Sequence, residues 1–403
     1  MLRSISKAPH LLAYFAECCQ NRTAVTSRLI PPISCLNVRF TSLLAKQKED
    51  QETADDRLVK KLYQGVVTGK RASLAEAITL VENINPRKRA LAERLLTDVL
   101  GYLRKKEQHN SGKPISFRAG LTGPPGAGKS SFIECFGKYL TGIGRKVAVL
   151  AVDPSSSSTG GSLLGDKTRM IELSRDVNAY IRPSPTSGTL GGVTRSTNEA
   201  ILLCEAAGYD VVLVETVGVG QSEYAVADMV DMFVLLIPPA AGDELQGIKK
   251  GIVEMADLIV VNKADGDLYI PAKRIQMEYV SAIKLLRKKS KNWNPKVMRV
   301  SSRKNEGMRE VWENMFEFYR VMTSTGEMKR RRSQQHKTWM WNHIRDHIIK
   351  LFKTHPSVEP QIKLLEEKVA KAVITPGLAA DVLMKSFSDA TKEAIEQDEK
   401  RLK

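Results

Sequence analysis

The chain is poor in cysteine and has no long apolar run, and each shortage excludes a class of protein. Its 403 residues include five cysteines and no C-x-x-C pair, so neither a zinc site nor a disulfide framework is indicated. Cys135 and Cys204 fall in predicted core helices, where buried free thiols are common. No apolar run approaches the ~20 residues that a membrane-spanning helix needs, and the sequence therefore predicts no membrane span.

Acidic residues are also in short supply, because 45 Asp and Glu face 62 Lys and Arg and leave a formal charge of +17. Residues 1–48 hold seven basic residues, one acidic residue and many serines, which is the composition of a mitochondrial transit peptide. Removing them takes away 7 − 1 = +6 and leaves +11. The segment lacks the apolar stretch of a secretory signal, and a disordered cytosolic arm is the alternative. We expect a protein of the mitochondrial matrix.

Hydrophobic spacing divides the rest of the chain into three regions. Residues 49–112 have apolar residues at helical spacing and predict an N-terminal helical region. Residues 113–325 alternate helices with short apolar strands, which predicts a doubly wound, mostly parallel α/β sheet. Residues 326–403 predict three helices and a charged tail; their aromatic-rich face packs on the N-terminal helices or, as we favour, forms a dimerisation arm. The expected strands are 115–121, 146–152, 178–181, 211–215, 232–237, 258–261 and 296–300.

A G-x-x-x-x-G-K-[ST] motif lies between the first expected strand and the next helix, and it predicts a phosphate-binding loop. Glycine lets successive backbone N–H groups turn toward phosphate, and the following helix places its positive end there. We expect Lys129 to reach the β- and γ-phosphates and Ser130 to bind Mg²⁺. A glycine-rich turn that merely matches the pattern is the alternative. The expected nucleotide contacts are Gly123, Pro124, Pro125, Gly126, Ala127, Gly128, Lys129, Ser130 and Ser131.

Three carboxylates form the predicted metal side of this site. Asp153 ends the second expected strand and could order the metal's waters or the attacking water, with an N-cap or turn aspartate as the alternative. Asp166 lies in a glycine-rich, switch-like loop, where a solvated surface aspartate is the alternative. Glu215 ends a strand of Walker B shape. With Ser130, phosphate and water, these carboxylates would complete the octahedral shell of Mg²⁺.

The segment Asn262-Lys263-Ala264-Asp265 follows an expected strand and fits the guanine-reading pattern N-K-x-D. A carboxylate at Asp265 can accept N1–H and the 2-amino group of guanine, and adenine offers neither donor. Because a buried carboxylate without partners is costly, the preference for guanine can reach ~10⁴-fold. The residues expected to add backbone contacts to the base are Ser301, Ser302 and Arg303.

Two further features have weaker interpretations. His343 and His347 share one helix face and could supply half of a metal site, but no third ligand accompanies them, so surface or interface histidines are favoured. The basic runs 287–291 and 329–332 could contact RNA or anionic lipid. No RNA-binding motif accompanies these runs, so solvated faces or partner contacts are favoured and no nucleic-acid partner is expected.

Together these motifs resemble the MeaB/ArgK type of P-loop GTPase over roughly residues 50–390. The most distinctive stretch, Gly242 to Gly251, matches the third switch of that family and implies working roles for Asp243, Gln246 and Lys249. The resemblance implies a homodimer that binds GTP or GDP with Mg²⁺ and couples GTP hydrolysis to methylmalonyl-CoA mutase. It implies that hydrolysis gates the loading of adenosylcobalamin and helps to eject damaged cofactor.

The chain also departs from related GTPases. Val219 stands where Ras-like GTPases place a water-orienting Gln, so we expect slow intrinsic hydrolysis that a partner accelerates. Related metallochaperone GTPases carry a Cys-rich motif or a His-rich tract, and this chain has neither. Two other functions stay open: an ATP- or GTP-dependent protein kinase, since some relatives have been called transport-system kinases, and an RNA-binding or targeting GTPase.

Overall fold

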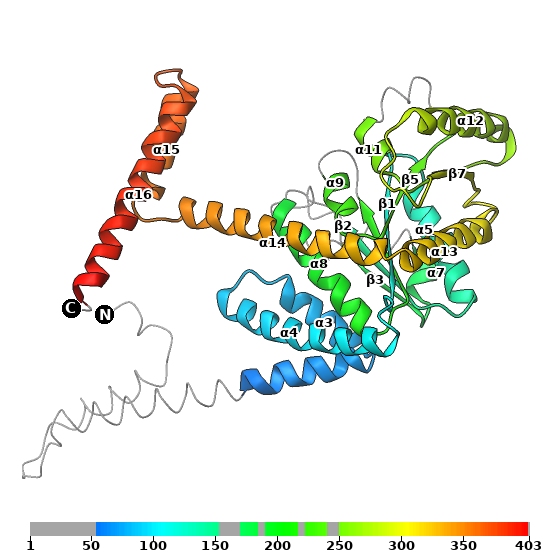
Figure 1. Cartoon of the computed structure of the whole chain (residues 1–403), viewed down its shortest axis with the longest axis horizontal. Coiled ribbons are helices and arrows are strands. Elements are labelled where there is room, and N and C mark those ends of the chain that lie inside the picture. Colours follow the sequence, from blue (N-terminus) through cyan, green and yellow to red (C-terminus); the bar gives the residue numbers. More distant parts are fainter. Residues whose placement is uncertain (1–53, 153–169, 184–189, 217–221, 240–249, 402–403) are drawn as a thin grey trace, which may run out of the picture. The chain divides into compact units, whose positions relative to one another are not determined.

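The computed structural model describes residues 54–152, 170–183, 190–216, 222–239 and 250–401, and the statements below concern these residues. The chain divides into two compact units, residues 1–58 and 59–403, and the second unit holds every labelled helix and strand. Within that unit, residues 59–67 are helical and precede the first labelled helix in Figure 1.

A seven-stranded parallel sheet forms the centre of this unit, with the strand order β3-β2-β4-β1-β5-β6-β7. The strands are β1 (Phe117–Thr122), β2 (Val147–Val152), β3 (Ala179–Arg182), β4 (Val211–Thr216), β5 (Met232–Ile237), β6 (Leu258–Val261) and β7 (Lys296–Arg299). Each lies within a residue or two of its predicted position. In β1, β2, β4 and β5 every residue is buried, as expected of strands that are covered on both faces. The doubly wound α/β prediction is therefore confirmed.

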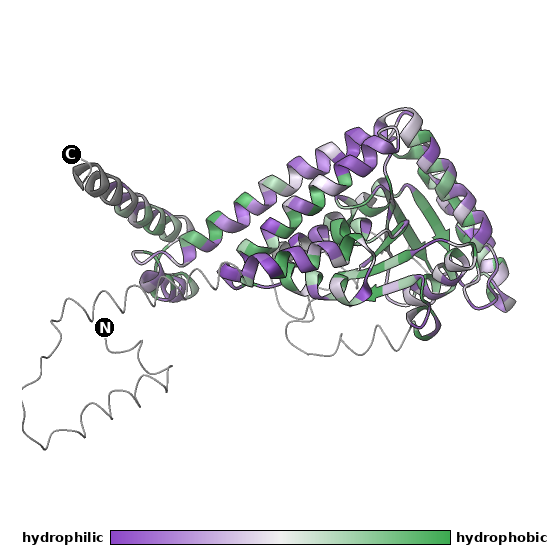
Figure 2. Cartoon of the chain, turned by 90° about the horizontal axis from the view of Figure 1, so that it is seen from below, coloured by the Kyte–Doolittle hydropathy of each residue, from purple (hydrophilic) through white to green (hydrophobic). Residues whose placement is uncertain are grey.

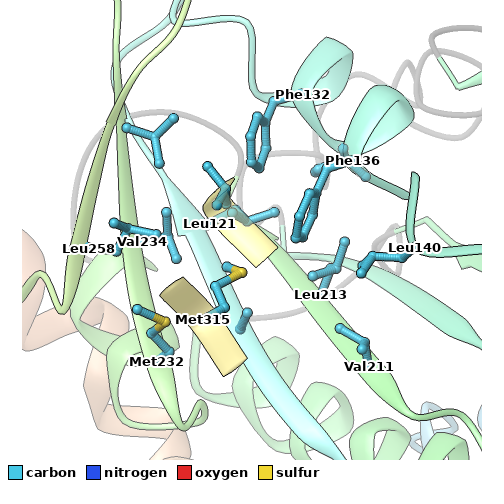
Figure 3. Close-up of a cluster of buried hydrophobic side chains, with 14 of the residues drawn as sticks. Leu121, Phe132, Phe136, Leu140, Val211, Leu213, Met232, Val234, Leu258 and Met315 are labelled. Atoms are coloured by element: carbon cyan, nitrogen blue, oxygen red, sulfur yellow. The ribbon is translucent and has the colours of Figure 1, made fainter. Parts of the chain in front are cut away.

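Helices cover both faces of the sheet. On one face lie α5 (Lys129–Gly142) and α13 (Met308–Ser324), and on the other lie α8 (Leu190–Ala206) and α9 (Ser222–Ala227). Phe132, Phe136 and Leu140 recur at helical spacing along α5 and point onto the sheet, as Figure 3 shows. Figure 2 shows the same arrangement as hydrophobic strands enclosed by helices that are largely hydrophilic. The helices α7 (Ile171–Ser174), α11 (Lys250–Met255) and α12 (Tyr269–Leu285) complete the layers.

Two N-terminal helices, α3 (Arg71–Val81) and α4 (Pro86–His109), pack on each other and on α8 (Figure 1). Helix α4 starts at Asn85-Pro86, where the Asn85 side chain accepts hydrogen bonds from the Arg87 and Lys88 backbone N–H groups. Arg89 of α4 forms a bidentate ion pair with Glu199 of α8. The N-terminal helices are thus joined to the layer that covers the sheet.

Three helices follow the sheet: α14 (Glu327–Lys353), α15 (Glu359–Ala370) and α16 (Pro376–Arg401). The charged tail expected after the three C-terminal helices is not a separate segment, because α16 continues through to Arg401. The residues that extend α16 include Ala, Lys, Glu and Gln, all strong helix formers, so helical propensity alone can continue the helix.

The basic run at the start of α14 is partly buried, which corrects the expectation of a solvated or partner-contacting face. Arg332, 8% exposed, donates to both carboxylate oxygens of Asp231 at 2.8 and 2.7 Å. Arg331 forms a bidentate pair with Asp257, and Lys289, from the other basic run, lies 3.2 Å from the same carboxylate. Burial would raise the pKa of Asp257, but Arg331 and Lys289 hold it below its usual range.

We expect Arg332→Ala to lower the free energy of unfolding by about 3–5 kcal/mol, because it leaves the fully buried Asp231 without its charged partner. Chemical denaturation measures this change. Arg330→Ala, two residues away and exposed, is the matched control and should change stability by less than about 0.5 kcal/mol. Equal effects of the two variants would contradict the assignment of a buried ion pair.

Candidate functional site

The phosphate loop lies at the carboxyl end of β1, between β4 and β5, where a doubly wound sheet binds its ligands. At two positions of this loop only glycine fits, because the backbone has a positive φ and a Cβ atom would clash with a neighbouring strand end. A Cβ on Gly123 would lie 2.1 Å from the Leu236 carbonyl oxygen. Gly128 has φ +80° and caps α5, and a Cβ there would lie 2.7 Å from Asn262 Nδ2. The loop is therefore pressed against the ends of β5 and β6.

Lys129 begins α5 and folds its side chain back over this loop. Its Nζ donates to the Gly123 carbonyl at 2.6 Å and to the Pro124 carbonyl at 3.2 Å, and the side chain is buried. Burial lowers the pKa of Lys129, while the charges of Glu215 and Glu223 oppose that shift. The ammonium group of Lys129 therefore lies directly over the phosphate loop.

Glu223, in the first turn of α9, is a residue that sequence reasoning did not single out. It is 4% exposed and acts electrostatically on Lys129. The signal that could have found it is its position close after Glu215 in the sequence, in the first turn of α9.

Ser130 and Glu215 meet beside Lys129, as predicted for a metal site. The Ser130 hydroxyl donates to Glu215 Oε1 at 3.1 Å, and Glu215 is 3% exposed near the end of β4. One hydroxyl and one carboxylate are hard oxygen ligands, and they suit Mg²⁺, which takes its other ligands from phosphate and water. Within the described ranges, no three His, Cys, Asp or Glu side chains cluster as an all-protein metal site.

Asn262, at the end of β6, joins three loops through one buried side chain. Its Nδ2 donates to the Ala127 carbonyl at 3.0 Å, which connects the N-K-x-D segment to the phosphate loop. Its Oδ1 accepts the Ser302 N–H at 3.2 Å and the Ser302 hydroxyl at 2.8 Å. Asn262 is 1% exposed. The side-chain amide of Asn262 therefore fixes the position of the predicted base-reading segment relative to the phosphate loop.

Asp265 lies beside the loop that follows β7. The Ser301 hydroxyl donates to Asp265 Oδ2 and accepts the Lys304 N–H at 3.1 Å, which orients the carboxylate. Lys263 has φ +58° and an exposed side chain, and Arg303 is also exposed. Asp265 is half-buried. The six residues predicted to contact the base thus come from two neighbouring loops, namely Asn262, Lys263, Asp265, Ser301, Ser302 and Arg303.

Other predicted residues have different outcomes. Asp153, Asp166 and Lys249 lie outside the described residues, as do the Val219 position and the residues Asp243 and Gln246. Among described residues, His343 is half-buried and burial lowers its pKa, whereas His347 is exposed. The two imidazole side chains therefore lie in different environments. Cys135 and Cys204 are free and buried, as predicted. No described helix is long and apolar enough to cross a membrane.

Comparisons with known proteins identify the family of this chain. A family model described as methylmalonyl Co-A mutase-associated GTPase MeaB matches residues 74–357. The chain is 63% identical over 344 residues to the mouse protein named methylmalonic aciduria type A homolog, mitochondrial, covering 85% of this chain and 83% of the mouse protein. It is 48% identical over 281 residues to the GTPase ArgK of Escherichia coli, covering 70% of this chain and 82% of ArgK.

The fold has a solved counterpart as well. The crystal structure of a LAO/AO transport system kinase is 36% identical, has a TM-score of 0.64, and covers 82% of this chain and 97% of its own. The family match spans more than half of the chain and includes the phosphate loop, Glu215 and the N-K-x-D segment. The chain therefore belongs to the MeaB/ArgK family of P-loop GTPases and is a GTP hydrolase.

Proposed function

We propose that this GTPase binds GTP and GDP with Mg²⁺ across the phosphate loop and the N-K-x-D segment, and uses hydrolysis to control a partner enzyme. The observation that carries the proposal is the Asn262 amide, which bridges these two segments at 3.0 Å. A nucleotide is long enough to touch both, and a rigid connection between them fixes the distance from its base to its phosphates.

The chain's own residues have distinct proposed roles. Lys129 would exchange the Gly123 and Pro124 carbonyls for phosphate oxygens and stabilise the charge that develops during phosphoryl transfer. Ser130 would bind Mg²⁺ directly, and Glu215 would hold it through water. When bound, Mg²⁺ neutralises charge on the β- and γ-phosphates. Asp153, Asp166 and Lys249 are proposed from the sequence as further metal-side or catalytic groups.

We propose methylmalonyl-CoA mutase as the partner. The matching family is described as associated with that mutase, and the mouse relative is named mitochondrial. The GTPase would act in the mitochondrial matrix as a chaperone and gatekeeper that controls adenosylcobalamin loading and protects or reactivates the mutase. The γ-phosphate would order loops that collapse on hydrolysis, and the mutase would distinguish the two shapes.

A homodimer fits the exposed apolar side chains of α14. Trp341, Ile348 and Ile349 are 61%, 58% and 48% exposed, although large apolar side chains more often lie in an interface or core. We propose that a second copy of the chain covers this part of α14.

Single-turnover hydrolysis with and without the mutase tests the proposal. We expect slow hydrolysis by the protein alone and a clear acceleration when purified mutase is added, because a partner must complete a site that has Val219 in place of Gln. Mixtures that contain the Lys129→Ala variant control for GTPase activity contributed by the mutase preparation. No acceleration at any mutase concentration would count against the partner assignment.

The same assay tests the alternative that the protein is a kinase, which we consider because the solved LAO/AO relative is named a transport system kinase. Label on the γ-phosphate should be released as inorganic phosphate. Stable transfer of label to a protein would favour a phosphotransferase instead.

A further inference from the structure

Helix α12 covers β7 at the edge of the sheet with one face and leaves the opposite face exposed (Figure 1). Ala272 and Tyr279 lie on the packed face and are 0% and 2% exposed. Ile270, Met277 and Leu285 are 70%, 63% and 87% exposed. Positions seven or eight residues apart lie on the same face of a helix about two turns further along. The three apolar side chains therefore form one row opposite the packed face.

Cations flank this row on both sides. At about 100° per residue, Lys273 and Lys284 fall on one side of the row and Arg274 falls on the other. Three more exposed cations follow the helix, namely Arg287, Lys288 and Lys291. Glu278, the one acidic residue between 269 and 291, is already paired with Arg274 at 3.0 Å. The outer face of α12 is thus apolar along its middle and basic along the edge that carries Lys273 and Lys284 and beyond its C-terminal end, while on the other edge Arg274 is paired with Glu278.

We propose that the outer face of α12 docks this GTPase on an anionic phospholipid surface. Ile270, Met277 and Leu285 enter the boundary between headgroups and acyl chains, and the flanking cations pair with lipid phosphates. Long Lys and Arg side chains can lie along apolar surface while their charges reach the headgroups. No spanning helix is involved, and the protein lies on the membrane surface.

The arrangement of charge favours lipid over an acidic protein. The apolar side chains stand on a convex ridge, and cations occur on both of its sides and past its C-terminal end. A plane of uniform negative charge can attract all five cations other than Arg274 at once. A protein partner would need a groove with an apolar floor and carboxylates on both walls.

Photocrosslinking to vesicles tests the proposal. A benzophenone side chain is placed at position 277 of the full chain, or at position 177 as a control, since Val177 is 81% exposed and lies outside α12. The vesicles contain phosphatidylcholine with or without phosphatidylglycerol. We expect lipid adducts at position 277 only when phosphatidylglycerol is present, and none at position 177. The readout is local, so binding through the basic N-terminal segment does not obscure it.

A charge-reversal pair gives the second measurement. Lys273→Glu combined with Lys284→Glu should reduce the adduct yield at position 277 about tenfold or more, because each exposed cation adds to the attraction of an anionic surface. Arg104→Glu combined with Lys105→Glu changes two exposed cations on α4 and should leave the yield unchanged. GTP hydrolysis should be the same in both variants. Adducts equal at positions 277 and 177, absent at position 277, or unaffected by the α12 reversal would overturn the proposal, and their absence at position 277 would favour an acidic protein as occupant.

Discussion

Lys129→Ala should reduce the affinity for GTP and GDP, and the rate of GTP hydrolysis, by about 10³-fold or more. The ammonium group lies over the phosphate loop, within 2.6 Å of the Gly123 carbonyl, and no other described cation donates to that loop. Alanine removes the charge that faces the β- and γ-phosphates. Isothermal titration calorimetry measures the affinity, and phosphate release measures the rate.

The loss at Lys129 can be separated from a folding defect. Because the ammonium is buried, its removal should not lower the stability of the protein without nucleotide, whereas the stabilisation that GDP adds should disappear. Thermal unfolding with and without GDP measures both quantities. Lys113→Ala, an exposed lysine before β1, is the control and should keep full GDP stabilisation. A Lys129→Ala protein that still binds GTP tightly would refute the role of this loop.

Asp265→Ala should abolish the preference for guanine over adenine nucleotides, which we expect to be on the order of 10⁴-fold in the natural protein. The carboxylate is oriented by the Ser301 hydroxyl, and we expect the base to lie against it. Without it, N1–H and the 2-amino group lose their shared acceptor. Competition among GTP, ATP and xanthosine triphosphate measures the preference.

Asp265→Asn provides a gain-of-function arm of the same experiment. An amide can donate to the 2-oxo group of xanthine, so this variant should bind xanthosine triphosphate better than GTP. Asp267→Ala, an exposed carboxylate in the next turn, is the matched control and should keep the guanine preference. If Asp265→Ala leaves the ratio of GTP to ATP affinity unchanged, the base assignment is wrong.

Many features of the fold could be predicted because they depend on local patterns. All seven strands were predicted, and the fully buried ones gave the clearest signal, since a strand buried on both faces is nearly continuous in apolar residues, as β5 is. The start of α4 was predictable from Asn85-Pro86, since an Asn cap and a proline in the first turn are local signals. The length of α16 was missed because a charged segment of strong helix formers suits a helix as well as a tail.

The candidate site divides in the same way. The spacing of glycines around Lys129 and the N-K-x-D segment were visible in the sequence, because each lies within a few consecutive residues. The bridge from Asn262 to Ala127 was not visible, because it joins positions 135 residues apart. Likewise, an arginine in a basic run is expected at the surface. Only the packing of α14 against the start of β5 makes Arg332 a buried partner of Asp231.

The sequence by itself predicted the order of strands along the chain, the phosphate loop and a preference for guanine. Each of these follows from backbone and side-chain chemistry within a short segment. The tertiary structure alone decided which loops share Asn262, which arginines are buried at the start of α14, and which face of α12 is exposed. Those outcomes depend on the parallel sheet, which brings the ends of separate strands together and pairs charges that no local pattern connects.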